Sequence, residues 1–374
     1  MHLHRHPLLH RLAGGLRAGM GALCIGILSL AGSEVCRAQV QGGGAAIPNG
    51  TPVTFQQIAT APLQASHESN RVRRFLDPAG QLVQVREQLT VQADGTPDAA
   101  FKLDFVDVVA PTGNTSSART QWSEVYRANA GLLHMHGGFR IADAQLAQQN
   151  YQIFDFGSCR RLGRDVRRVV IYPNRQDKGA WMVDLDVQTG VVLYSAEYDA
   201  QLRLINELET TSFVVTGYIV ELGPRSRTKP AWSWRPKMQV SKYADLSGAA
   251  AQLGSMTPIQ PAIQSLVTDY RQSLVQVTED PVNGDRTLVL GYSDGIDEFF
   301  VLQTQGGGNP FSDHPAVRNV NATSAHAIAS YDDASMRAYV FHESGTTFWV
   351  VGSGSLARLK DVSFRICQQA VTGS

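Results

Sequence analysis

The chain lacks an excess of charge of either sign, because 33 Lys and Arg residues balance 33 Asp and Glu residues over 374 positions. Proteins that bind nucleic acid usually carry a basic patch, so the sequence gives no global electrostatic case for nucleic acid as a partner. It also lacks a phosphate-binding loop of the Walker type and a dinucleotide-binding glycine pattern. Only four cysteines occur, without the spacing of a zinc site. We therefore expect no cofactor and no metal.

Long hydrophobic runs are missing except near the N-terminus. Residues 18–31 form an apolar core that follows several arginines, and residues 36–38 offer small side chains at positions −3 and −1 of a cleavage site. We expect a signal peptide at 1–38, a mature chain that begins at Gln39, and a periplasmic location. A short membrane anchor is the alternative, although the apolar core is shorter than the ~20 residues that a span needs.

The apolar content is 43%, which supports real hydrophobic cores, and the length suits two domains. Runs rich in β-branched and aromatic residues follow one another with short turns between them, which is typical of an antiparallel β-meander. The clearest runs are 151–156, 166–172, 181–186, 191–198 and 202–215.

Further elements flank this meander on both sides. Before it we expect strands at 71–76, 82–91 and 101–109 and helices at 121–133 and 141–149. After it we expect strands at 272–279, 286–291, 299–303, 325–330, 336–343 and 346–351 and a short helix at 356–363. The predicted domains are a flexible segment at 39–55, a large domain at 56–220, a proline-rich linker at 221–238 and a second domain at 239–370.

Three motifs resemble the MucB/RseB family of periplasmic regulators of an envelope-stress sigma factor. The first is Phe-Gly-Ser-Cys-Arg-Arg-Leu-Gly-Arg at 156–164, followed by Trp-Met-Val-Asp-Leu-Asp-Val-Gln-Thr-Gly at 181–190. The second is the Tyr-Ser-Asp-Gly turn at 292–295, and the third is Trp-Val-Val-Gly at 349–352. The motifs occur in the order that the family shows. The N-terminal third is poorly matched, and the stretches 246–265 and 305–325 look like insertions.

The resemblance implies an α+β fold. The large domain would be a curved antiparallel half-barrel with covering helices, similar to the lipoprotein carriers LolA and LolB, and the C-terminal domain a smaller, mainly antiparallel α+β unit. It implies a non-enzymatic regulator that binds the periplasmic segment of a membrane anti-sigma factor and senses lipid. The alternative is a LolA-like carrier of lipoprotein or lipid. Homo-oligomerisation stays open.

Two sets of residues are candidates for binding. Guanidinium groups suit carboxylates and phosphates, so an arginine-rich hairpin is a candidate partner site, with a solvated strand edge as the alternative; it carries Arg160, Arg161, Arg164, Arg167 and Arg168. Apolar side chains that alternate along the strands could line a lipid groove, with an ordinary helix-covered core as the alternative. These are Phe101, Phe105, Phe154, Phe156, Met182, Leu193 and Phe213.

Cys159 and Cys367 remain after signal cleavage, and the sequence leaves open whether they form a disulfide or stay as two buried thiols. His134 and His136 would share a strand face, but no third metal ligand follows nearby.

Catalytic patterns are weak. Asp184 and Asp186 share a strand face before a turn, and we expect them to be solvated rather than to act as a catalytic pair. Ser293 beside Asp294 lacks a nucleophile elbow or a positioned histidine, so a hydrolase is disfavoured.

Overall fold

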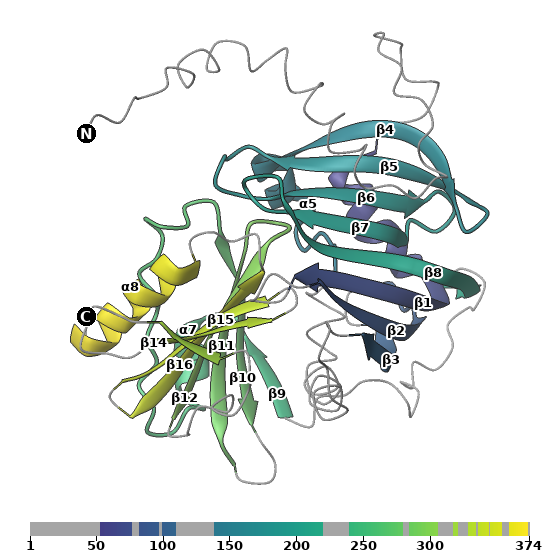
Figure 1. Cartoon of the computed structure of the whole chain (residues 1–374). Helices are drawn as coiled ribbons and strands as arrows, with labels where there is room; N and C mark the ends of the chain where they lie inside the picture. The colour runs from purple at the N-terminus through teal and green to yellow at the C-terminus, as the bar shows by residue number, and fades with distance from the viewer. Residues whose placement is uncertain are drawn as a thin grey trace, which may run out of the picture.

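The structure is a computed structural model of the whole chain (Figure 1). It describes residues 53–76, 82–96, 99–109, 138–219, 239–279, 284–305, 317–320, 328–333, 336–343, 345–353 and 359–372. Five predictions lie wholly or mostly outside these ranges: the signal peptide, the flexible segment at 39–55, the helix at 121–133, the histidine pair and the linker at 221–238.

Two eight-stranded antiparallel sheets make up the fold, as the meander predicted. The first sheet has the order β3-β2-β1-β8-β7-β6-β5-β4, and it is open because β3 and β4 do not pair with each other. Its strands are β1 (Ala65–Leu76), β2 (Leu82–Gln92), β3 (Ala100–Val109), β4 (Tyr151–Arg161), β5 (Arg164–Pro173), β6 (Ala180–Asp186), β7 (Val192–Tyr198) and β8 (Leu204–Tyr218).

The second sheet has the order β13-β14-β15-β16-β12-β11-β10-β9. Its strands are β9 (Gln239–Tyr243), β10 (Arg271–Glu279), β11 (Arg286–Ser293), β12 (Glu298–Gln305), β13 (Val317–Val320), β14 (Ile328–Asp333), β15 (Met336–Glu343) and β16 (Thr346–Ser353). The sequence analysis did not predict β9 or β13. The α+β class with two antiparallel units is confirmed.

Helices are few and short in the part of the chain that the structure describes. They are α2 (Phe55–Thr60), the 3-10 helix η2 (Ala61–Gln64), α5 (Ala144–Asn150), α7 (Leu246–Ala250) and α8 (Leu359–Thr372). Side chains cap three of them at the N-terminus. Thr54 and Gln57 form a capping box on α2, Asp143 accepts a hydrogen bond from the Leu146 backbone at the start of α5, and Asp245 accepts one from the Gly248 backbone at the start of α7. None of the described helices is long and apolar enough to cross a bilayer.

Alternation along β6 separates the two faces of the first sheet. Trp181, Val183 and Leu185 belong to an apolar cluster with residues of α2 and α5, so they define the helix side. Met182 and Asp184 point to the opposite side, since successive side chains of a strand alternate. In Figure 1 the purple helical segments lie behind the first sheet.

The second sheet has a core of its own. Central strands contribute Leu288, Leu290, Phe299 and Val350, and α8 covers them with side chains that include Ile366. Apolar residues that recur at helical spacing along α8 explain why this segment folds against the sheet.

Candidate functional site

An ion-pair network crosses the face of the first sheet opposite the helices. Asp184 is fully buried and accepts hydrogen bonds from Arg168 Nε at 2.7 Å and from Arg161 Nη2 at 3.0 Å. Arg161 also donates to Glu209 at 3.2 Å, and its guanidinium lies 4.5 Å from the centre of the Tyr194 ring. The five side chains come from five strands, β4 to β8, so the network ties these strands together.

The network continues onto β1. Arg74 donates to Glu207 at 2.9 Å and to Glu209 at 2.8 Å, and the Tyr194 hydroxyl donates to Glu207 at 2.8 Å. Burial, together with the Glu207 carboxylate, raises the pKa of Tyr194, so its hydroxyl stays a donor. Each cation of the network is matched by a carboxylate, which is the condition under which charge is tolerated inside a protein. We call these seven residues the sheet network.

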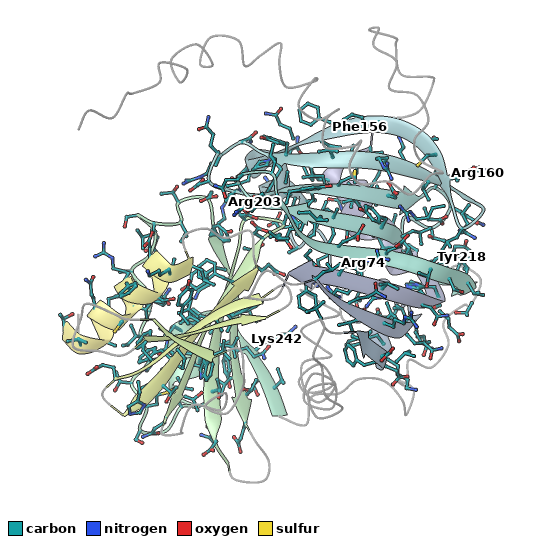
Figure 2. All side chains as sticks on the ribbon, viewed as in Figure 1. Arg74, Phe156, Arg160, Arg203, Tyr218 and Lys242 are labelled. Atoms are coloured by element: carbon teal, nitrogen blue, oxygen red, sulfur yellow. The ribbon has the colours of Figure 1, made fainter. Side chains whose placement is uncertain are left out.

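All five candidate arginines pair with carboxylates of the chain, and four of them are largely buried. Arg161 and Arg168 belong to the sheet network, Arg164 pairs with Asp186 at 2.7 Å, and Arg167 pairs with Asp155 at 2.5 Å. Arg160 differs in exposure, because its side chain is 69% exposed and its ion pair with Asp165 is exposed to the same extent. It lies at the end of the β4–β5 hairpin that points away from the second sheet (Figure 2). The structure therefore leaves Arg160 as the most accessible charge of this set.

The prediction that Asp184 and Asp186 are solvated is wrong. Both are buried, Asp184 at 0% and Asp186 at 2% exposure. Burial favours the neutral acid, but hydrogen bonds from Arg164 and Thr189 outweigh it and hold the pKa of Asp186 below its ordinary value. The burial of these aspartates could not be predicted from the sequence, because their arginine partners lie on neighbouring strands and not beside them in the chain.

The lipid-groove candidates do not share one surface. Phe101 and Phe105 pack in a cluster of β1, β2 and β3 on the helix side of the sheet. Met182 faces the opposite side, and Leu193 packs in a third cluster with the partly buried Phe213. Phe154 and Phe156 are half-buried on the edge strand β4. Figure 2 places Phe156 on that edge.

Cys159 and Cys367 are not joined by a disulfide. Cys159 is partly buried against Val166 and Leu193 in the first sheet, and Cys367 is buried in α8 under the second sheet. Burial raises the pKa of the Cys367 thiol. Of the two alternatives that the sequence left open, the structure contains two thiols.

A second constellation joins the two sheets. Lys178, in the turn between β5 and β6, makes ion pairs with Asp269 and Asp294 of the other domain. The Tyr151 hydroxyl donates to Asp294 at 2.7 Å, and the Asn150 amide donates to the backbone oxygens of Asp294 at 2.8 Å and Asp269 at 3.2 Å. Lys178 also lies 4.3 Å from the centre of the Tyr270 ring. We call these residues, with Gly295, the joint.

Burial and neighbouring carboxylates set the protonation states in the joint. Burial alone would lower the pKa of Lys178, but the carboxylates of Asp294 and Asp297 raise it above its ordinary value. Burial and the same two carboxylates raise the pKa of Tyr151 well above 10.0. The lysine is therefore charged and the tyrosine is protonated at neutral pH.

The second sequence motif supplies the other half of the joint. Ser293 and Asp294 accept hydrogen bonds from backbone amides of their own turn, so neither is placed as a catalytic group. Gly295 has φ +106° and presents its carbonyl to the amides of Ala142 at 2.9 Å and Asp143 at 3.3 Å. A Cβ on Gly295 would lie 2.2 Å from the Ala147 backbone nitrogen, so only glycine permits this approach.

The sequence predicts a turn at 292–295 but does not indicate which residues of the first domain contact it. Lys178, Asn150 and Tyr151 carried no local signal, because their partners in the second domain are about 90 to 145 residues away in the sequence. Across the described ranges, no group of three or more His, Cys, Asp and Glu residues could hold a metal ion.

Known proteins were compared with this chain by sequence and by structure. No family model matches the sequence, and no curated protein matches it. The chain is similar to MucB crystallised in complex with MucA(peri), with 16% identity, a TM-score of 0.43 and coverage of 82% of this chain and 95% of that one. It is similar to the Pseudomonas aeruginosa MucA/MucB complex at 13% identity and a TM-score of 0.42, and to MucB alone at 13% and 0.43, each over 83% of this chain and 95% of the other.

Proposed function

We propose that this chain is a periplasmic, non-enzymatic regulator that binds the periplasmic segment of a membrane anti-sigma factor. The three sequence motifs that resemble the MucB/RseB family support the proposal. The observation that carries it is the position of the second motif, because the turn at 292–295 forms the joint between the two sheets. A motif that fixes how two binding surfaces are presented suits a regulator that engages one partner with both domains.

The geometry also favours binding over catalysis for the most buried polar groups. Asp184 is saturated by two arginines, and Asp294 by Tyr151, Lys178 and its own turn. A catalytic carboxylate must be free to exchange a proton with a substrate, and these positions are occupied by permanent partners. A lipid carrier of the LolA kind would need one continuous apolar lining, and the seven groove candidates are spread over separate packing groups.

The test begins with the mature chain, residues 39–374, as bait in a detergent extract of its own cell envelope, with mass spectrometry of both proteins and lipids. The expected result is a single-pass anti-sigma protein, whose purified periplasmic segment then binds the bait in calorimetry. Recovery of acylated proteins or lipid without such a partner would reject the regulator in favour of transport.

Arg160→Glu offers a finer test of the partner surface. Its matched control is Arg203→Glu, because Arg203 is 75% exposed and also pairs with a nearby aspartate, Asp199, on a different turn of the same sheet. We expect Arg160→Glu to weaken binding of the anti-sigma segment by about tenfold and Arg203→Glu to leave it unchanged. Equal effects of the two substitutions would place the partner elsewhere.

A further inference from the structure

The contact between the two domains is largely polar. In the described ranges, Ile296 is the one residue of the second domain that belongs to an apolar cluster of the first. Polar contacts are more numerous: besides the joint they include the Arg140–Glu298 and Arg175–Asp269 pairs, each at 3.6 Å. Two hydrogen bonds add to them, from Arg271 to Gln149 at 3.2 Å and from Arg175 to Thr268 at 3.4 Å. Interdomain interfaces of this polar kind allow relative domain motion unless specific contacts hold them.

The joined arrangement leaves polar groups without partners. The Tyr270 hydroxyl is buried beside Lys178 and makes no hydrogen bond, and Arg140 Nε is buried at a distance from Glu298 that is too long for one. An unmade hydrogen bond at a buried donor destabilises the state that contains it, and water would satisfy both groups if the domains separated. The closed arrangement therefore depends on the ion pairs that Lys178 makes.

Lys178 is the centre of those contacts. It reaches Asp269 and Asp294, which lie on two different loops of the second domain, and it is 6% exposed. Removing one partner of a buried pair is costly, because the remaining charges are left uncompensated. Loss of the Lys178 charge would leave these two aspartates of the second domain close together and without its counter-charge.

We propose that Lys178 is a latch between two domain arrangements. In the closed arrangement, Lys178 holds Asp269 and Asp294, and the Gly295 carbonyl accepts from the amides of Ala142 and Asp143. In the open arrangement the turn at 292–295 has left α5, and the charged groups of the joint are hydrated. This inference concerns the chain alone and holds whichever partner the protein binds.

The test compares hydrogen exchange in the mature wild type, Lys178→Met and Lys102→Met. Methionine keeps the length and apolar stem of lysine and removes the charge. Lys102 is the matched control, since it pairs with Asp104 on the exposed part of one strand. We expect Lys178→Met to speed exchange at the Ala142 and Asp143 amides about ten- to a hundredfold, with the central strands of both sheets unchanged. Lys102→Met should match the wild type.

A second variant keeps the test decisive if Lys178→Met does not fold. Asn150→Ala removes two hydrogen bonds to the second domain and leaves Lys178 in place. It should speed exchange at the same two amides and increase the radius of gyration in solution scattering. Unchanged exchange at Ala142 and Asp143 in both variants would overturn the latch, and so would equal acceleration throughout both sheets, which would indicate global destabilisation.

Discussion

At the scale of single residues, the carboxylate of Asp184 is the group of the sheet network on which we expect stability to depend most. Asp184 neutralises two buried guanidinium groups. Asp184→Asn keeps the shape but removes the buried negative charge that both guanidinium groups contact, so we expect a loss of about 3 kcal/mol in the free energy of unfolding. Urea unfolding measures it. Asp165→Asn is the control, because its pair with Arg160 is exposed and should contribute under about 1 kcal/mol. Similar losses in both variants would contradict a special role for Asp184.

His67 gives the first sheet a pH dependence. Burial, against a hydrogen bond with the Ala65 carbonyl, lowers the pKa of His67 from 6.5 to about 4. The unfolded chain therefore binds the proton first as the pH falls, and stability is lost between pH 6.5 and about 4. We expect the wild type to lose about 2 kcal/mol from this group between pH 7 and pH 5. His67→Asn retains a donor and should lose that much less over the same range in urea unfolding; parallel losses would contradict this assignment.

At the scale of elements, the β4–β5 hairpin carries strain at its tip. Leu162 has φ +53°, beside Gly163 at φ +73°, in a two-residue turn where asparagine is favoured over leucine. Leu162→Asn should raise the free energy of unfolding by about 0.5–1 kcal/mol. Leu204→Asn is the matched control, since Leu204 is similarly exposed, 40% against 43%, but lies in a strand. It should be neutral or destabilising in thermal unfolding, and a gain in the control as large as that at Leu162 would refute the strain.

Strand positions were predictable because each depends on nearby residues. The runs that became β5, β6 and β7 are rich in β-branched and aromatic side chains and end at turn residues, which fixes their existence locally. The strand predicted at 151–156 is longer in the structure, where β4 continues to Arg161. Its register with β5 shifts between Asp155 and Ser158, so Gly157 lies in a bulge and the strand does not end there.

At the scale of the whole molecule, prediction from sequence was weaker because pairing is long-range. The strand β1 pairs with β8 across about 140 residues, and no local pattern indicates it. The same holds for the sites: arginines clustered in the sequence suggested a surface, while the fold turns four of them toward carboxylates of the same sheet. The joint could not be predicted either, because its contacts are long-range; only its turn at 292–295 was predicted.

Gly295 couples the unfolding of the two sheets. A methyl group there would collide with the Ala147 backbone, so Gly295→Ala should separate the turn at 292–295 from α5 while each sheet keeps its own core. Gly345→Ala is the matched control, because Gly345 also has positive φ, +77°, but has no atom within 4 Å of an added Cβ. Both variants bear backbone strain of about 1 kcal/mol, and only the first loses the contact between domains.

In calorimetry we expect one transition for the wild type and for Gly345→Ala, and two for Gly295→Ala, since domains without coupling melt independently. A single transition for Gly295→Ala, lowered only as far as that of Gly345→Ala, would mean that the turn adds strain but no coupling, and that the sheets are held together by contacts other than the joint.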